Sequence, residues 1–250
     1  MVSNLENPDV DTTQVLTHTS YRENLTNNLI SMAIQYDLDG INVDMEALSS
    51  DAGDGYIQFI RELSIKCEKN DIVLSVDNYV PSSYTAFYDR AEQALFADYI
   101  IIMGYDEHYK GSKEAGSVAS IDFVKKGISD TLEEVPAEQT ILGIPFYTRL
   151  WAETPEEGDK VKITSEVVRM NAQQTVVNNS GVSPEWSDKY GQYYLEYAAD
   201  GVTYKMWMEE EKSIEQKLKA MKEADLAGSS VWKLGMENTS VWDTIIKYMN

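Results

Sequence analysis

The stretch Asp39-Gly-Ile-Asn-Val-Asp-Met-Glu46 alternates polar and apolar residues, which is typical of a β-strand with one buried face. Successive side chains of a strand point to opposite faces, so Asn42, Asp44 and Glu46 share one face and the apolar residues between them share the other. Parallel α/β proteins place their active sites at the carboxyl ends of their strands. The stretch therefore predicts a strand from about Gly40 to Glu46 that carries two carboxyl groups to a candidate active site.

Two carboxyl groups at such a place favour acid catalysis. Burial of a carboxylate is costly, and two like charges at short range do not ionise independently. One of the pair therefore tends to keep a proton near neutral pH, which is the property that a general acid needs. The alternative interpretation is an acidic strand end that faces solvent or a helix N-terminus. Residues 39–46 by themselves leave both interpretations open.

Strands and helices alternate along most of the chain. Short apolar runs predict further strands, and apolar residues at helical spacing predict the helices between them. The strands are expected at 72–76, 99–105, 140–144 and 229–234, and the helices at 54–69, 84–96, 121–133, 213–224 and 241–248. This alternation is typical of an α/β protein whose parallel sheet is covered on both faces. Five strand–helix units fit either an open, doubly wound sheet or the C-terminal part of a (β/α)₈ barrel, which has eight.

Residues 151–208 interrupt the alternation. The segment is too long for a loop, and we expect it to form a small α+β insertion. Residues 164–178 are expected to be helical. The segments 193–197 and 202–207 flank Asp200-Gly201, a dipeptide typical of β-hairpin turns, so they predict a hairpin.

Charge and apolar content point away from two classes of protein. The 250 residues contain 42 acidic and 21 basic side chains, and this net charge of −21 argues against a nucleic-acid partner, because phosphates require a basic surface. No apolar run approaches the roughly 18 residues that span a bilayer, so we expect a soluble protein without membrane insertion. Residues 1–8 lack the basic start and apolar core of a signal peptide, so export would depend on a signal outside this chain.

We expect neither a metal ion nor a cofactor. His18 and His108 are 90 positions apart and show no metal-ligand spacing. No phosphate-cradling glycine loop and no serine elbow occur. His108 follows the acidic residues Asp106 and Glu107, and we expect it to tune or brace their loop. Cys67, the single cysteine, falls on the apolar face of the helix expected at 54–69, which predicts a buried, unreactive thiol.

Four segments of the chain resemble one enzyme family. Residues 39–46 resemble the DxxDxDxE signature of glycoside hydrolase family 18, the chitinase-like enzymes, with Asn42 at the second acidic position. The family's sixth, seventh and eighth strands are similar to Met103-Gly-Tyr-Asp106, Ile141-Leu-Gly-Ile-Pro-Phe-Tyr147 and Val231-Trp-Lys-Leu-Gly235, in that order. Order and spacing agree from about residue 20 to the C-terminus. The resemblance implies an α/β fold of the (β/α)₈ TIM-barrel type, with the signature on the fourth strand.

The same resemblance implies a partial barrel. Val2-Ser-Asn4 is similar to the end of the family's third strand, so we expect this chain to lack the first two strands and to belong to a longer protein. Residues 1–250 would form the catalytic domain, and the α+β insertion at 151–208 would follow the seventh strand. The edge strand of the sheet would then expose unpaired backbone N–H and C=O groups. Self-association through this edge is one way in which they could be paired.

The resemblance also implies which residues carry out catalysis. Family members are retaining enzymes in which the substrate's own N-acetyl group takes the place of a carboxylate nucleophile. By this resemblance Glu46 is the general acid, Asp44 orients the acetamido group, and Tyr105 hydrogen-bonds the acetamido carbonyl.

Substrate-binding residues are implied in the same way. Asn42 occupies a signature position, Asp106 is expected to contact a sugar hydroxyl, and Trp232 is expected to stack on a pyranose ring. Tyr147 and Trp151 lie near predicted strand ends and would line further subsites. For Tyr147 and Trp151 a purely structural role is an equally good interpretation.

Three further segments resemble a bacterial branch of cortex-lytic and peptidoglycan-directed N-acetylglucosaminidases; they are Tyr105-Asp-Glu-His-Tyr109, Gly116-Ser-Val-Ala-Ser120 and Trp207-Met-Glu-Glu210. This resemblance implies a glycosidase that cleaves β-1,4-linked polymers containing N-acetylglucosamine, either peptidoglycan, spore cortex or chitin. Its place of action would be extracellular, in the cell envelope or in the spore coat. The alternative is a catalytically silent glycan-binding protein of the same fold, and the presence of an acid at position 46 favours the enzyme.

Overall fold

The computed structural model describes residues 1–7, 9–158 and 160–249. These residues divide into two compact units. Unit 1 consists of Met1–Met103 and Ser129–Ile141, and unit 2 consists of Gly104–Ile128 and Leu142–Asn250.

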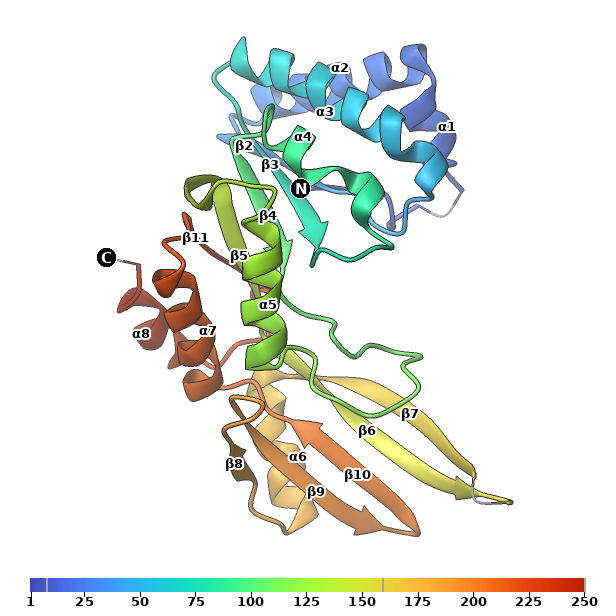
Figure 1. The fold of residues 1–250 in the computed structure, drawn as a ribbon, viewed down its shortest axis with the longest axis vertical. Coiled ribbons are helices and arrows are strands. Elements are labelled where there is room, and N and C mark those ends of the chain that lie inside the picture. The colour runs from blue at the N-terminus through green and yellow to red at the C-terminus, as the bar shows by residue number, and fades with distance from the viewer. Residues whose placement is uncertain (8, 159, 250) are drawn as a thin grey trace. The chain divides into compact units, whose positions relative to one another are not determined.

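Unit 1 is built on parallel strands that lie in sequence order. β1 (Val2–Ser3) pairs with β2 (Gly40–Asp44), β2 pairs with β3 (Val73–Tyr79), and β3 pairs with β4 (Tyr99–Met103). Parallel neighbours need a long crossover connection, and helices provide it here (Figure 1). The strands predicted at 40–46, 72–76 and 99–105 are therefore confirmed, as is their parallel pairing.

Three helices pack together beside these strands: α1 (Thr12–Thr17), α2 (Thr19–Gln35) and α3 (Gly53–Glu68). Asp11 precedes α1, and its side chain accepts a hydrogen bond from the backbone N–H of Gln14 and so caps the helix. The approach of α1 to α3 depends on Gly55. A Cβ atom at this position would lie 2.6 Å from the carbonyl oxygen of Leu16, so a larger residue would push the two helices apart.

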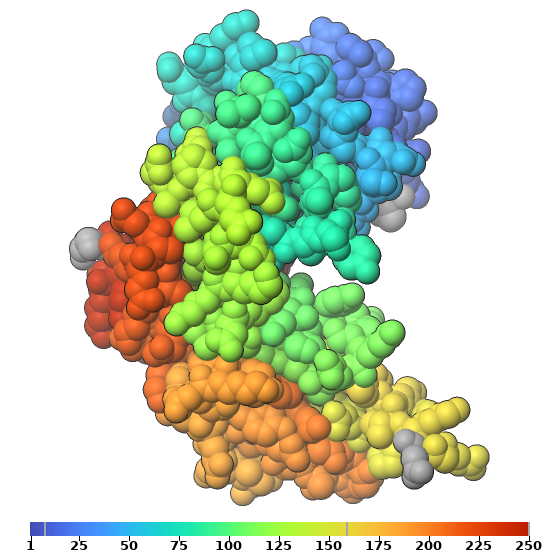
Figure 2. Space-filling view, viewed as in Figure 1, coloured from blue at the N-terminus to red at the C-terminus, as the bar shows by residue number. Residues whose placement is uncertain are grey.

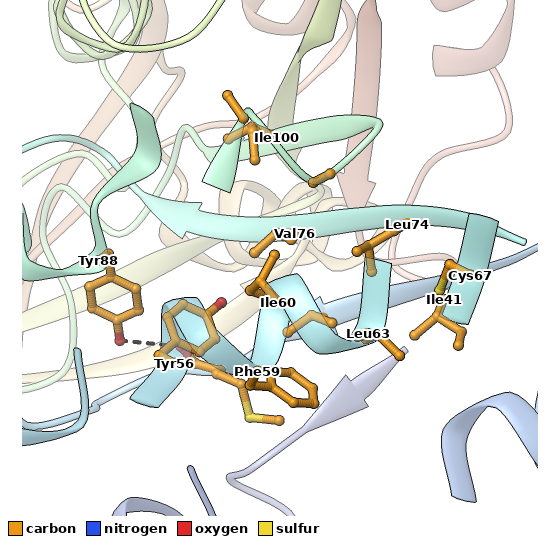
Figure 3. Packing of buried hydrophobic residues seen from close by; sticks show 14 of the residues in the cluster. Ile41, Tyr56, Phe59, Ile60, Leu63, Cys67, Leu74, Val76, Tyr88 and Ile100 are labelled. Carbon is orange, nitrogen blue, oxygen red and sulfur yellow. Dashed lines mark hydrogen bonds between the residues drawn. The ribbon is translucent and has the colours of Figure 1, made fainter. Parts of the chain in front are cut away.

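The apolar face of α3 forms the centre of the unit 1 core (Figure 3). Tyr56, Phe59, Ile60 and Leu63 recur at helical spacing, and all four are completely buried. Cys67 lies on the same face, and burial raises the pKa of its thiol to about 11, which makes the thiolate scarce at neutral pH. The burial predicted for this cysteine is confirmed. Strand residues that complete the core include Val43, Leu74, Val76 and Ile100.

The continuous helix predicted at 84–96 is wrong. The segment contains a 3₁₀ turn, η2 (Ala86–Tyr88), and a short helix, α4 (Arg90–Gln93). Asp89 separates them with a φ of +49°, a left-handed conformation that a helix cannot continue through. Its side chain accepts the backbone N–H of Glu92 and caps α4, so a local side-chain bond divides the apolar pattern into two elements.

In unit 2, residues of β5 (Thr140–Pro145) lie beside β11 (Gly228–Trp232). The backbone N–H of Phe146, which directly follows β5, donates to the carbonyl of Trp232, the last residue of β11, at 2.7 Å. The helices α5 (Ile121–Thr131), α7 (Glu211–Glu223) and α8 (Val241–Ile246) confirm those predicted at 121–133, 213–224 and 241–248. The strands predicted at 140–144 and 229–234 are confirmed as well.

The second sheet of unit 2 is antiparallel, with the strand order β7-β6-β10-β9-β8. β9 and β10 form the predicted hairpin, and Asp200 and Gly201 both have positive φ in its turn. One face of this sheet packs on α6 (Gln173–Ser180) through Leu150, Val168, Leu195 and Met206. Figure 2 shows β6 and β7, in yellow, extending past β9 and β10, in orange. The bounds are β6 Tyr147–Glu156, β7 Lys160–Arg169, β8 Glu185–Ser187, β9 Gln192–Ala199 and β10 Val202–Trp207.

The helix predicted at 164–178 is wrong in its first part. Residues up to Arg169 belong to β7, and the helix α6 begins only at Gln173. β7 is rich in β-branched residues and pairs with β6 over ten positions, from Tyr147 opposite Arg169 to Glu156 opposite Lys160. The many hydrogen bonds of this long ladder favour the strand. The local spacing of apolar residues does not reveal pairing with another segment.

Within the described part of the chain, no helix is both long and apolar enough to span a membrane.

Candidate active site

The strand β2 brings Asn42 and Asp44 to one face, as the alternation predicted. The side-chain amide Nδ2 of Asn42 donates to Ser75 Oγ at 3.0 Å and to Asp77 Oδ1 at 3.1 Å, both on the neighbouring strand β3. Asp44 is 6% exposed, and burial raises the pKa of its carboxyl group. Its Oδ1 atom is buried and accepts no hydrogen bond from any of the described residues. The polar face of β2 is therefore a partly desolvated acidic site.

Glu46 follows β2 by two residues, and its backbone is held from β1. The side chain of Asn4 donates from Nδ2 to the Glu46 carbonyl at 2.8 Å and accepts the Glu46 backbone N–H at Oδ1, also at 2.8 Å. This double hydrogen bond extends the pairing of β1 with β2 beyond the last paired residues. The position of the Glu46 backbone thus depends on a residue 42 positions earlier in the chain.

Two tyrosines hold the segment around Glu46. The hydroxyl of Tyr79 accepts the backbone N–H of Ala47 at 3.1 Å and is hydrogen-bonded to the side chain of Glu46. The hydroxyl of Tyr88 donates to the carbonyl of Met45 at 3.2 Å and accepts the backbone N–H of Leu48 at 3.3 Å. Burial raises the pKa of both tyrosines, to about 12 for Tyr88, so both hydroxyls keep their protons as donors.

The ring of Tyr88 is in turn held by the unit 1 core. It meets Tyr56 edge to face at a centroid distance of 5.6 Å (Figure 3). It also meets the ring of Tyr79 edge to face at 5.9 Å. The tyrosine hydroxyls that position residues 45–48 are therefore fixed by aromatic packing.

Asp77 is a site residue that the sequence analysis missed. It lies on β3, and burial raises its pKa to about 7, with the nearby charges of Asp44 and Glu46 acting in the same direction. The segment 73–79 alternates polar and apolar residues, which was the available signal. The pairing of β3 with β2 was needed to show that Asp77 faces Asn42.

In unit 2 the structure brings Tyr105, Asp106 and Tyr147 together. The hydroxyl of Tyr147 donates to Asp106 Oδ1 at 2.6 Å, and the rings of Tyr105 and Tyr147 meet edge to face at a centroid distance of 6.2 Å. Tyr147 is 6% exposed, and burial followed by the charge of Asp106 raises its pKa. Asp106 itself has a left-handed backbone with φ of +58° and is exposed.

The loop after Asp106 is braced as predicted by His108. A ring nitrogen of His108 is hydrogen-bonded to the Ser117 carbonyl at 2.8 Å, and the ring covers Gly116 so closely that a Cβ there would lie 2.4 Å from it. Trp151, 1% exposed, donates from Nε1 to the Gly116 carbonyl at 2.8 Å. Trp151 thus supports this loop from within, and its predicted contact with a sugar stays a prediction.

Trp232 is placed differently from the other tryptophan of the predicted site. It ends β11 with its ring 38% exposed, and the Nζ of Lys233 lies 5.7 Å from the ring centroid. An indole face open to solvent is suited to stacking on a sugar ring. Among the described residues, no group of three or more His, Cys, Asp or Glu side chains is arranged to hold a metal ion.

A parallel sheet with carboxyl groups at a strand end, and an antiparallel sheet inserted after β5, is an architecture that solved structures share. The structure is similar to the spore cortex-lytic enzyme SleL of Bacillus megaterium QM B1551, with a TM-score of 0.86 and 19% identity over 99% of this chain and 58% of that chain. It is also similar to a chitinase from Chromobacterium violaceum ATCC 12472, with a TM-score of 0.87 and 25% identity over 99% of this chain and 78% of that chain. The fold is therefore α/β and TIM-barrel-like, with an additional antiparallel sheet, as predicted.

Residues 11–237 match the family described as "Glycosyl hydrolases family 18", and the chain belongs to this family of glycosidases. Among curated proteins it is 29% identical to the "Uncharacterized glycosylase YvbX" of Bacillus subtilis (strain 168), over 94% of this chain and 68% of that protein. The resemblance found in the sequence is confirmed.

Proposed function

We propose that this chain carries the catalytic residues of a retaining glycosidase that cleaves β-1,4-linked polymers of N-acetylglucosamine in the bacterial envelope, with Glu46 as the proton donor. One observation supports this assignment above the others. The Glu46 backbone is held by two hydrogen bonds from Asn4, and its side chain is hydrogen-bonded to the Tyr79 hydroxyl. A carboxyl group fixed through both backbone and side chain is suited to transfer a proton along a defined direction.

The first step of the proposed reaction breaks the glycosidic bond. Glu46 gives its proton to the glycosidic oxygen, and the leaving sugar departs with that proton. The acetamido oxygen of the substrate attacks the anomeric carbon and forms a cyclic oxazolinium ion, so no second carboxylate is needed as nucleophile. Asp44 accepts the acetamido N–H and stabilises the positive charge that develops on it. The low exposure of Asp44 strengthens this electrostatic interaction.

The second step restores the enzyme. Glu46, now a carboxylate, removes a proton from water, and the resulting hydroxide attacks the anomeric carbon from the face that the leaving group vacated. The ring of the oxazolinium ion opens, the acetamido group is regenerated, and the configuration at the anomeric carbon is retained. The first step leaves Glu46 as the carboxylate that the second step requires, and the second step returns it to the protonated form that the first step requires.

The remaining predicted residues are assigned to substrate binding. Tyr105 would donate its hydroxyl proton to the acetamido carbonyl, and Asp106, held by Tyr147, would accept a hydrogen bond from a sugar hydroxyl. The exposed ring of Trp232 would stack on a pyranose. Asn42 would act indirectly, through its hydrogen bonds to β3.

The proposed substrate class follows from the relatives. One similar structure is described as a spore cortex-lytic enzyme and another as a chitinase. Both descriptions point to polymers that contain N-acetylglucosamine. We propose peptidoglycan, spore cortex or chitin as the substrate, and the cell envelope, the spore coat or the exterior as the place of action. This chain spans 58% of the cortex-lytic structure and 68% of the YvbX glycosylase, so the proposal concerns the reaction that these residues perform.

The test compares wild type with Glu46→Gln in the full-length protein, on chitin oligomers and on purified peptidoglycan. We expect release of reducing ends to fall at least about 100-fold, because general acid catalysis contributes 10²–10⁴-fold, while the dissociation constant for the oligomer stays within about two-fold. Wild-type turnover in the variant would overturn the assignment of the acid. Binding without turnover in the wild-type protein would instead identify a catalytically silent glycan-binding protein.

A further inference from the structure

Asp77 and Asp44 occupy facing positions on neighbouring strands. The parallel register of β2 and β3 places Asn42 opposite Ser75 and Val43 opposite Val76, and the same register continued by one residue places Asp44 beside Asp77, on which its charge acts. Neighbouring strands lie about 4.8 Å apart, and residues at alternate positions share a face. Since Asn42 bonds to Asp77, both carboxyl groups lie on the Asn42 side of the sheet.

Asn42 fixes one of these carboxyl groups. Its Nδ2 atom donates to Asp77 Oδ1 at 3.1 Å and to Ser75 Oγ at 3.0 Å. An amide cannot exchange a proton with a carboxyl group near neutral pH, so Asn42 orients Asp77 without competing for its proton. Asp77 Oδ2 receives no hydrogen bond from Asn42 and is the oxygen left for another partner.

Asp44 presents the complementary feature. Its Oδ1 atom is buried and has no hydrogen-bond partner among the described residues. A buried carboxylate oxygen without a donor is rare because its desolvation is not compensated. A proton held between the two aspartates would compensate it and would remove the repulsion between two facing negative charges.

We propose that Asp77 is a positioning residue for Asp44: the two carboxyl groups hold one proton between them, and Asn42 keeps Asp77 in place. The inference rests on the proposed function, in which Asp44 binds the acetamido group. As positive charge develops on that group, the ionised form of Asp44 is stabilised and the shared proton passes from Asp44 to Asp77. The proton returns when the product leaves, so no other reactant is required.

The titration of Asp77 is consistent with this arrangement. Burial, with the charges of Asp44 and Glu46 acting in the same direction, raises its pKa to about 7, against the hydrogen bond from Asn42 and the amino group of Met1, which lower it. The charges of both aspartates also act on Tyr56, whose pKa is raised well above its ordinary value, mainly by burial, so it stays neutral. The raised pKa of Asp77 favours retention of one proton by the pair near neutral pH.

The test is a titration of the aspartate carboxyl carbons by ¹³C NMR in the full-length protein. In the wild type we expect the pair to titrate in two coupled steps, the upper one near pH 7. Asp77→Asn should remove the upper step and leave Asp44 with a single step at lower pH, because the repelling charge is gone. Asp44→Asn should likewise lower the pKa of Asp77. Unchanged titration of the remaining aspartate in both variants would overturn the proposal.

Turnover supplies the second measurement. Asp77→Asn should lower kcat at least about ten-fold with little change in KM, since the charge that stabilises the transition state is then less well placed. The exchanged double variant Asn42→Asp/Asp77→Asn restores one amide and one carboxyl beside Asp44, and it should recover most of that loss. Ser75→Ala removes the other acceptor of Asn42 without removing a carboxyl group and serves as the matched control.

The outcomes separate the two proposals. If no glycan is cleaved but the aspartates titrate as a pair, the proposed function fails and the pairing of Asp44 with Asp77 stands. If Glu46→Gln abolishes turnover while Asp77→Asn retains full kcat and an unaltered Asp44 titration, the proposed function stands and the role of Asp77 fails. An impaired double variant alongside an active Asp77→Asn protein also contradicts the role of Asp77.

Discussion

The side chain of Asn4 forms two hydrogen bonds with the backbone of Glu46, both at 2.8 Å, and so joins the segment after β1 to the proposed proton donor. Neither residue lies inside a regular strand, since β1 ends at Ser3 and β2 ends at Asp44. The side-chain amide therefore replaces the backbone pairing that has stopped two residues earlier.

Replacement of Asn4 should impair catalysis through the position of Glu46. Asn4→Ala removes both hydrogen bonds, each worth about 0.5–1.5 kcal/mol, and we expect kcat to fall about ten-fold or more with KM nearly constant. Asn4→Asp keeps an acceptor for the Glu46 N–H, so its kcat should lie between the values for the wild type and for Asn4→Ala. Steady-state kinetics on an N-acetylglucosamine oligomer provide the measurement. Asn7→Ala, in the same segment but exposed, is the control, and equal kcat values for the Asn4 and Asn7 variants would contradict the prediction.

Tyr79→Phe should lower turnover without unfolding the protein. The change keeps the ring that meets Tyr88 and removes the hydroxyl that binds both the Glu46 side chain and the Ala47 N–H. We expect kcat to fall about ten-fold, because a misdirected acid transfers its proton poorly. Circular dichroism should show an unchanged fold. Tyr84→Phe alters a tyrosine that is 88% exposed and should leave kcat unchanged; a similar loss in both variants would rule out a specific role for Tyr79.

Gly116→Ala should destabilise the loop that follows Asp106. The new methyl group would lie 2.4 Å from the ring of His108, which is itself bonded to Ser117. Overpacking of this kind costs about 1–3 kcal/mol, and urea denaturation should show this decrease in the free energy of unfolding. Gly228→Ala is the matched control, since a Cβ at Gly228 has no atom within 4 Å and its φ is not positive. Equal stabilities of the two variants would show that the loop shifts to accept the methyl group.

Lys217→Met should cost more stability than any exposed lysine variant. Lys217 Nζ lies 2.9 Å from Glu209 Oε2, and both side chains are at most 1% exposed. Removal of the cation leaves a buried carboxylate whose pKa burial already raises, and loss of one partner of such a pair costs about 3–5 kcal/mol. Lys219→Met breaks an exposed pair with Glu215 and should cost about 0.5 kcal/mol or less. A loss of stability for Lys217→Met as small as that for Lys219→Met would contradict the prediction.

Local patterns in the sequence were sufficient wherever one short segment decides its own structure. The period-two alternation of residues 40–46 placed Asn42 and Asp44 on one face, and the period of α3 placed Cys67 in the core. The dipeptide Asp200-Gly201 predicted its hairpin because both residues tolerate positive φ. These features depend on steric preferences over a few neighbouring residues, so the local sequence is sufficient to predict them.

Local periodicity failed where hydrogen bonds outside the periodic pattern decide the backbone conformation. Residues 164–169 have an acceptable helical pattern, but ten paired positions with β6 make them a strand. The helix predicted at 84–96 is divided by the conformation of Asp89. At 164–169 the pairing with a distant strand outweighs the local preference, and at Asp89 the bond from the Glu92 N–H to the Asp89 side chain does.

Some features of the acidic site could be predicted from the sequence, and others were revealed only by the tertiary structure. The sequence by itself determined the family and the face of β2 that carries Asp44, because motif and alternation are local. The tertiary structure alone decided that Asn4 holds Glu46 and that Asp77 faces Asp44, contacts that span 42 and 33 positions of the chain. Strand register sets such contacts, and register is fixed only when the helices and strands of unit 1 close on a common core.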